Sequence, residues 1–166
     1  SLVEIAMSWW SPDKQLTRLI KIEGMENLRS ALNGGHGIIL LSAHFTTLEI
    51  GGRLLRLHTS FHVMYRNQKN LLFDTVMTNS RKRNFDKAIH RNNIRALIKS
   101  LKDNMPVWYA PDQNFGDKQK VFAPFFGIPA ATNPSTSRLA KSTGARVVPF
   151  FQECLPGLKG YRVKLL

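Results

Sequence analysis

Apolar residues follow two alternating patterns along this chain. Short apolar runs, typical of buried strands, predict strands at 18–23, 37–42, 61–65, 107–110, 146–152 and 161–166. Between these runs, apolar residues recur every three or four positions, which predicts helices over 25–33, 46–57, 71–83, 94–102 and 134–142. Strands that alternate with helices are typical of an α/β fold. We therefore expect a mixed, mostly parallel sheet flanked by helices.

The length and composition predict one folded domain. The chain has 166 residues, of which 43% are hydrophobic, enough to bury a substantial core. It has no internal repeat and no linker-like stretch, so residues 1–166 are predicted to form a single domain. Residues 2–10 already have an amphipathic pattern, and residues 161–166 end within a predicted strand. We therefore expect the chain to be a fragment of a longer protein.

The charge is strongly basic. Twenty-four Lys and Arg residues oppose eleven Asp and Glu residues, for a formal net charge of +13. Such a charge attracts nucleic acid, acidic proteins, phosphorylated lipids or an anionic membrane surface, and charge alone does not choose among them. The single cysteine, Cys154, excludes an internal disulfide. No Cys/His spacing resembles a zinc site, and we expect no metal site.

His44 and Glu49 form the most informative motif. His44 follows the apolar run 37–42, and Glu49 lies five positions later, inside the next predicted helix. Histidine is the usual general base near neutral pH, and a nearby carboxylate can fix its tautomer. The pair is therefore a candidate dyad for moving an acyl group onto an alcohol. An alternative reading is structural, because Thr46 and Glu49 also have the spacing of a helix capping box.

Polar residues follow three of the predicted strands. These are His44, Arg66 and Asp112. In sheets of this class, sites tend to form beyond the carboxyl ends of the strands. The three side chains are therefore expected to converge on one crevice.

Two further segments each allow a structural and a functional interpretation. Arg81, Lys82 and Arg83 end a predicted helix, where positive charge is favourable. One of these arginines is also suited to hold phosphate or carboxylate. Residues 110–116 read as a turn, in which Asp112 could pair with an arginine. The aromatic run 122–126 suits either the core or an acyl-chain pocket.

These blocks together resemble one protein family. The run from His44 to Arg53 resembles the catalytic segment of the bacterial lipid A biosynthesis acyltransferases, the late enzymes of the Kdo2-lipid IV-A lauroyl- and myristoyltransferase type. The likeness continues, in order and with similar spacing, through 65–67, 81–83, 91–95, 107–113 and 122–127. It covers nearly the whole chain. Residues 113–115 (Gln-Asn-Phe) differ from the family pattern, in which acidic and aromatic residues are often found at this point.

The resemblance implies an activity and a set of site residues. The family transfers a fatty acyl chain from acyl-acyl carrier protein to a hydroxyl of a lipid A precursor, in lipopolysaccharide and lipooligosaccharide biosynthesis. By this resemblance, His44 and Glu49 are the catalytic HX4D/E dyad. Arg81 and Asp112 match two further polar positions important to activity, and Arg66 and Arg83 are candidates for phosphate binding. No cofactor is implied.

The resemblance also implies partners and a location. The partners are acyl carrier protein, the phosphorylated lipid A precursor and an anionic membrane surface, at the cytoplasmic face of the bacterial inner membrane. The implied fold is a sandwich like that of the glycerol-phosphate acyltransferases. Family members carry an N-terminal membrane helix and a C-terminal portion, and both are expected to be missing from this chain.

We expect direct transfer, without an acyl-enzyme. His44 takes the proton from the acceptor hydroxyl, which attacks the thioester, and Glu49 orients His44. Arg81 binds phosphate or stabilises the oxyanion, and Asp112 orients Arg81.

Two alternatives remain open at this stage. A glycerophospholipid acyltransferase of the lysophosphatidate type shares the histidine and acid chemistry but prefers Asp where Glu49 stands. A basic nucleic-acid-binding module using residues 81–95 belongs to a different class. The chain has no recognised nucleic-acid motif, so no nucleic acid is expected as a partner.

Overall fold

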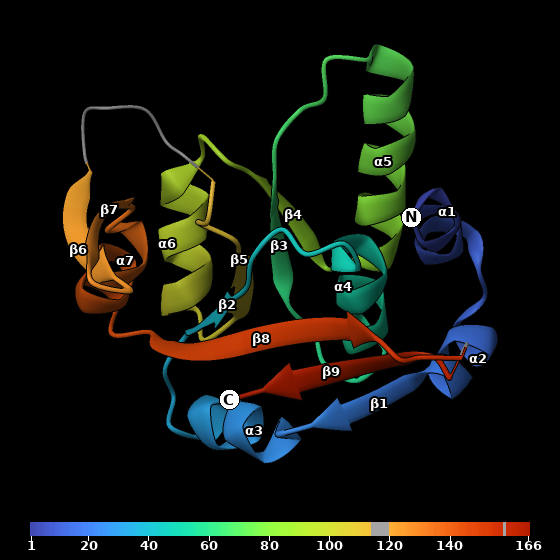
Figure 1. Ribbon diagram of the computed structural model, residues 1–166, viewed down its shortest axis with the longest axis horizontal. Coiled ribbons are helices and arrows are strands. Elements are labelled where there is room, and N and C mark those ends of the chain that lie inside the picture. The colour runs from blue at the N-terminus through green and yellow to red at the C-terminus, as the bar shows by residue number, and fades with distance from the viewer. Residues whose placement is uncertain (114–119, 158) are drawn as a thin grey trace.

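A twisted sheet runs through the centre of the computed structural model, which describes residues 1–113, 120–157 and 159–166 (Figure 1). Within these residues, the sheet has seven strands in the order β1-β9-β8-β2-β5-β3-β4. Their bounds are β1 (Ile20–Glu23), β2 (Ile38–Leu41), β3 (His62–Tyr65), β4 (Lys87–His90), β5 (Pro106–Tyr109), β8 (Arg146–Cys154) and β9 (Tyr161–Leu165). Neighbours from β8 to β4 pair in parallel, β9 is antiparallel to β8, and β1 is parallel to β9. The predicted mixed, mostly parallel sheet is confirmed.

Helices connect the strands and cover the sheet. They are α1 (Leu2–Trp10), α2 (Asp13–Leu16), the 3₁₀ helix η1 (Thr17–Leu19), α3 (Met25–Asn33), α4 (Leu48–Arg56), α5 (Leu71–Asn84), α6 (Ile94–Lys102) and α7 (Ser135–Thr143). The predictions for 25–33 and 94–102 match α3 and α6 at both ends. No helix in the described part of the chain is long and apolar enough to cross a membrane.

Five elements were not predicted from the sequence, and η1 is one of them. The others are α2, the edge strand β4, and the two strands of an antiparallel hairpin, β6 (Val121–Phe125) and β7 (Ile128–Thr132). The aromatic run 122–126 lies in this hairpin, at one end of the molecule (Figure 1). Phe122, Phe125 and Phe126 are exposed, so of the two interpretations of this run, core or acyl-chain pocket, the core is wrong for these three side chains. Asn114 and Phe115, where the family pattern varies, lie outside the described residues.

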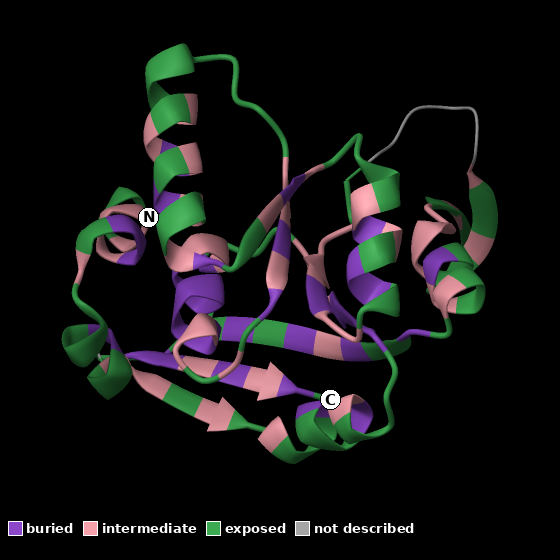
Figure 2. Cartoon of the chain, turned by 180° about the vertical axis from the view of Figure 1, so that it is seen from behind, coloured by how far each residue is buried: buried purple, intermediate pink, exposed green. Residues whose placement is uncertain are grey.

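The alternation of side chains along β2 builds two hydrophobic layers. Ile38 and Leu40 pack in one buried cluster with residues of α3 and α4. Ile39 points to the other face and packs in a second cluster with residues of α6 and α7. A strand buried on both faces is continuously apolar, because neighbouring side chains alternate between faces. Figure 2 shows this burial along the middle of the sheet.

Helix α4 lies very close to the sheet, because it carries glycine at the contact. A Cβ atom at Gly52 would overlap the ring of Trp108 on β5. That ring is itself packed against Phe61 and Phe150, with ring centroids 6.3 and 5.5 Å away. The absence of a side chain at Gly52 therefore sets the distance between α4 and the sheet.

Gly52→Ala is expected to destabilise the fold. The added methyl group overpacks a well-filled core, which costs about 1–3 kcal/mol and outweighs the better helix propensity of alanine. Chemical denaturation gives the change in the free energy of unfolding. Gly34→Ala is the matched control, because its Cβ would lie 3.3 Å from the movable His36 ring and no closer than 3.4 Å to any other atom. Equal stability of the two variants would contradict this account of the α4 contact.

Candidate active site

The pairing of two neighbouring strands brings His44 and Asp112 together. In the parallel ladder of β2 and β5, Leu41 lies opposite Tyr109. The backbone N–H of Ser42 continues the ladder by donating to the carbonyl of Tyr109, at 3.0 Å. His44 and Asp112 are each three residues beyond the last pair, so the register carries them to the same point. Figure 1 shows both segments leaving the sheet on the same side.

One carboxylate holds both the ring and the backbone of His44. The Nδ1 atom of His44 lies 2.6 Å from Oδ1 of Asp112. The backbone N–H of His44 donates to Oδ2 of the same carboxylate, at 2.9 Å. Both oxygens of Asp112 are therefore engaged by one residue, which restricts the orientation of the imidazole.

The charge state of Asp112 determines which ring nitrogen is free. Partial burial raises the pKa of Asp112, but the hydrogen bonds from the backbone and ring of His44 outweigh it and lower the pKa below 3.8. The carboxylate is therefore ionised near neutral pH and only accepts hydrogen bonds. The Nδ1 atom of a neutral His44 must then carry the proton, and Nε2 is the unprotonated nitrogen. The side chains of His44 and Asp112 are 41% and 37% exposed, so a substrate can reach them.

Glu49 and Arg81 form a second pair. Glu49 lies in the first turn of α4, and Arg81 in the last turn of α5. The guanidinium of Arg81 donates to Oε1 of Glu49. This pair is more buried, with side chains 15% exposed for Arg81 and 19% for Glu49. The hydroxyl of Ser8 donates to the backbone carbonyl of Glu49, at 3.1 Å, and so ties α1 to the start of α4.

The structure corrects the expected pairing of these four residues. We expected Glu49 to orient His44 and Asp112 to orient Arg81. In the described residues the partner of His44 is Asp112, and the partner of Arg81 is Glu49. The physical reason is that the strand register places Asp112 opposite His44, whereas the turn into α4 directs Glu49 toward α5.

The capping-box reading of Glu49 is also wrong. The residue that precedes α4 is Thr47, not Thr46, and its side chain makes no capping hydrogen bond. The Thr47 hydroxyl donates instead to the backbone carbonyl of Gln152, at 3.1 Å. The Glu49 carboxylate is therefore available for Arg81.

Gln152 is a supporting residue that the sequence reasoning missed. It is buried on β8, and its side-chain oxygen accepts a hydrogen bond from the Ser42 hydroxyl, at 3.4 Å. Together with the Thr47 contact, it fixes the segment that carries His44 at both ends. The signal was present in the sequence, because Gln152 continues the alternating series of Val148 and Phe150, which are buried.

The two remaining candidates do not join these pairs. Arg66 lies just beyond β3 and is exposed, and its guanidinium makes no hydrogen bond or ion pair within the described residues. Arg83 donates to the backbone carbonyl of Trp9, on α1. The predicted convergence of three strand ends therefore holds for His44 and Asp112 but not for Arg66.

Comparisons with known proteins match one family over the length of this chain. The family model for bacterial lipid A biosynthesis acyltransferases matches residues 1–166. The chain is 37% identical to the lipid A biosynthesis lauroyltransferase of Escherichia coli K12 over 166 residues, which cover 99% of this chain and 54% of that protein. It is 35% identical to the palmitoleoyltransferase of the same organism over 164 residues, covering 98% of this chain and 54% of that protein.

A relative from another organism gives a similar result. A lipid A biosynthesis acyltransferase of Haemophilus influenzae is 36% identical over 152 residues, covering 90% of this chain and 48% of that protein. The chain thus spans about half the length of the curated relatives that it matches.

Asp112→Asn is expected to lower stability in a pH-dependent way. Because folding lowers the pKa of Asp112, its ionised form stabilises the folded state above the ordinary pKa of 3.8. This contribution is lost as the pH falls through the lowered pKa. Denaturation at pH 7 and at pH 3 should show a difference between wild type and variant that shrinks at the lower pH.

Glu26→Gln is the control for this measurement. Its carboxylate is exposed and makes no hydrogen bond or ion pair within the described residues. We expect little change in stability at either pH. A destabilisation by Asp112→Asn that is equal at both pH values would contradict the assigned hydrogen bonds.

Proposed function

The chain belongs to the bacterial lipid A biosynthesis acyltransferase family, and we propose on this basis that it transfers a fatty acyl chain to a hydroxyl of a lipid A precursor. The proposed donor is the thioester of acyl-acyl carrier protein. The observation that carries the proposal is the His44–Asp112 pair, which leaves Nε2 of an accessible histidine free to accept a proton.

The proposed reaction is one direct substitution at the thioester carbonyl. Nε2 of His44 accepts the proton of the acceptor hydroxyl, and the oxygen attacks the carbonyl carbon to form a tetrahedral oxyanion. The carbon–sulfur bond then breaks, the ester forms, and the leaving thiolate takes the proton from His44. Asp112 stabilises the imidazolium between these two steps, because its carboxylate already contacts Nδ1.

Arg81 is proposed to act on negative charge, with Glu49 holding it in place. One terminal nitrogen of the guanidinium is committed to Glu49. The other donors remain to stabilise the oxyanion or to bind a substrate phosphate. Glu49 is thus a positioning residue for Arg81 in this mechanism, and Asp112 is a positioning residue for His44.

The charge and the exposed apolar side chains support the proposed partners. An acidic carrier protein and a phosphorylated lipid both complement a net charge of +13. Leu71 and Leu72 at the start of α5, and Phe122 and Phe126 of the β6–β7 hairpin, are exposed. Exposed apolar side chains on a basic protein suit contact with an anionic membrane surface. We propose that the full-length protein works at the cytoplasmic face of the inner membrane.

Transfer assays on the full-length protein test the proposed base. Removing a general base costs about 10²–10⁴ in rate, so His44→Ala should lower kcat by that factor. His58→Ala is the control, because His58 is exposed at the turn after α4 and lies outside the proposed site. Near-wild-type turnover of His44→Ala would exclude His44 as the base. Labelled acyl groups bound covalently to the protein would exclude direct transfer.

An acceptor panel separates the proposed function from a glycerophospholipid acyltransferase. The expected result is transfer to lipid IV-A and little transfer to lysophosphatidate. The names of the relatives support this choice, because they refer to lipid A biosynthesis. Preferential acylation of lysophosphatidate would contradict the proposal.

A further inference from the structure

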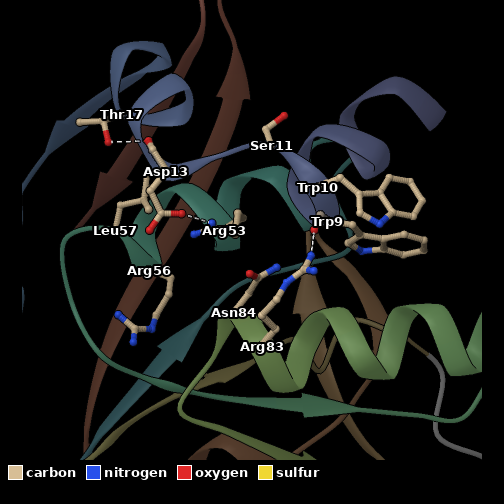
Figure 3. Close-up of a pocket in the computed structure, with 10 residues that line it drawn as sticks. All are labelled: Trp9, Trp10, Ser11, Asp13, Thr17, Arg53, Arg56, Leu57, Arg83 and Asn84. Carbon is tan, nitrogen blue, oxygen red and sulfur yellow. Dashed lines mark hydrogen bonds and ion pairs between the residues drawn. The ribbon is translucent and has the colours of Figure 1, made fainter.

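A cavity of about 530 Å³ lies among α1, α2, α4 and α5 (Figure 3). Its lining includes two aromatic residues, three basic residues and one acid, namely Trp9, Trp10, Arg53, Arg56, Arg83 and Asp13. None of the four residues of the candidate active site lines it. We call this space the arginine cavity.

The arginine cavity has an excess of positive charge. Arg53 is paired with Asp13, and Arg56 donates to Asp86 at 2.7 Å. Arg83 donates to the backbone carbonyl of Trp9, which carries no charge (Figure 3). Of the three guanidinium groups that line the cavity, those of Arg53 and Arg56 are each paired with a carboxylate. The charge of Arg83 has no acidic partner within the described residues, so it is the source of the excess.

Several buried donors around this cavity have no acceptor in the structure. The Nε atoms of Arg53 and Arg56 and the indole Nε1 of Trp9 are buried without a hydrogen-bond partner. Arg53 is 7% exposed and Trp9 is 5% exposed, so the main part of each residue is withdrawn from water. A buried donor without an acceptor is costly. Each of these three nitrogens has less than 1 Å² of accessible surface. A ligand that brings several acceptor oxygens would therefore remove this cost only if the side chains turned toward the cavity on binding.

Phosphate has the chemistry that these groups require. Its oxygens accept several hydrogen bonds at once, and its negative charge complements the guanidinium groups. We propose that the arginine cavity is a phosphate-binding site, distinct from the His44–Asp112 pair. The phosphate group is that of a lipid headgroup or of a soluble phosphate ester.

The cavity and the candidate active site are built on the same two helices. Helix α4 carries Glu49 in its first turn and Arg53 and Arg56 in its last, and α5 carries both Arg81 and Arg83. At 1.5 Å of rise per residue, Arg56 lies roughly 10 Å along α4 from Glu49. A bound phosphate therefore occupies a different place from a hydroxyl at His44. The inference does not depend on the proposed acyl transfer, because it concerns binding alone.

Titration with inorganic phosphate tests the site directly. The indole N–H resonances of Trp9 and Trp10 are followed by NMR at constant ionic strength, with that of Trp108, in the sheet, as an internal reference. Phosphate is expected to shift the Trp9 and Trp10 resonances in a saturable way and to leave Trp108 unchanged. Absence of a saturable shift in the wild type would overturn the proposal.

Matched variants locate the binding. Arg83→Gln and Arg56→Gln should each weaken phosphate binding roughly tenfold or more, because each removes a charge-assisted hydrogen bond. Arg29→Gln makes the same charge change on the exposed face of α3 and should leave the affinity unchanged. Arg83→Lys keeps the charge without the planar fork and should be intermediate. Equal affinity of wild type, Arg83→Gln and Arg56→Gln would overturn the proposal.

A second experiment distinguishes the two possible sources of the phosphate group, a lipid headgroup and a soluble phosphate ester. Sedimentation with phosphatidylcholine vesicles, with and without phosphatidylglycerol, measures lipid binding. If Arg83→Gln weakens binding to anionic vesicles more than Arg29→Gln does, the headgroup of a lipid is the source. If the two variants bind vesicles equally while Arg83→Gln loses inorganic phosphate, the source is a soluble phosphate ester. His44→Ala should keep wild-type phosphate affinity, so failure of the transfer assay and failure of this proposal are distinguishable.

Discussion

The fixed register between β2 and β5 is the constraint on which the candidate active site depends. Parallel pairing of Leu41 with Tyr109 carries the two chains side by side out of the sheet, so His44 meets Asp112. A slip of one residue would turn every side chain of β2 to the opposite face of the sheet. Because Ile38 and Leu40 are buried on one face and Ile39 on the other, the cores on both faces of the sheet fix the register. The geometry of the site is therefore a consequence of hydrophobic packing.

Contacts from other parts of the chain hold the segment between β2 and α4. Gln152 on β8 receives hydrogen bonds from Ser42 and Thr47, one on each side of His44. Ser8 on α1 donates to the backbone of Glu49, whose carboxylate engages Arg81 on α5. The accessible histidine is thus supported by buried or half-buried polar residues. Such an arrangement keeps the imidazole in one orientation while leaving its second nitrogen accessible, as the proposed general base requires.

The sequence predicted local structure better than it predicted partners. Helices α3 and α6 were placed correctly, because their apolar spacing is regular and a glycine or asparagine precedes each. Strand β4 was missed, because its sequence, Lys-Ala-Ile-His, is that of a half-exposed edge strand. The four residues that form the two pairs were all named from motif and resemblance. Their partners were predicted wrongly: His44 pairs with Asp112 and Arg81 pairs with Glu49. The pairing depends on strand register and on the direction of the Glu49 side chain, and neither is visible in the local sequence pattern.

The central claim is that Asp112 fixes His44 with Nδ1 protonated and Nε2 free. Side-chain ¹⁵N NMR of the labelled protein tests it most directly, because couplings between the ring nitrogens and the carbon-bound protons distinguish the two neutral tautomers. At a pH where His44 is neutral, the account predicts the Nδ1–H tautomer in the wild type and loss of this preference in Asp112→Asn. A wild-type His44 that carries its proton on Nε2 would contradict the account.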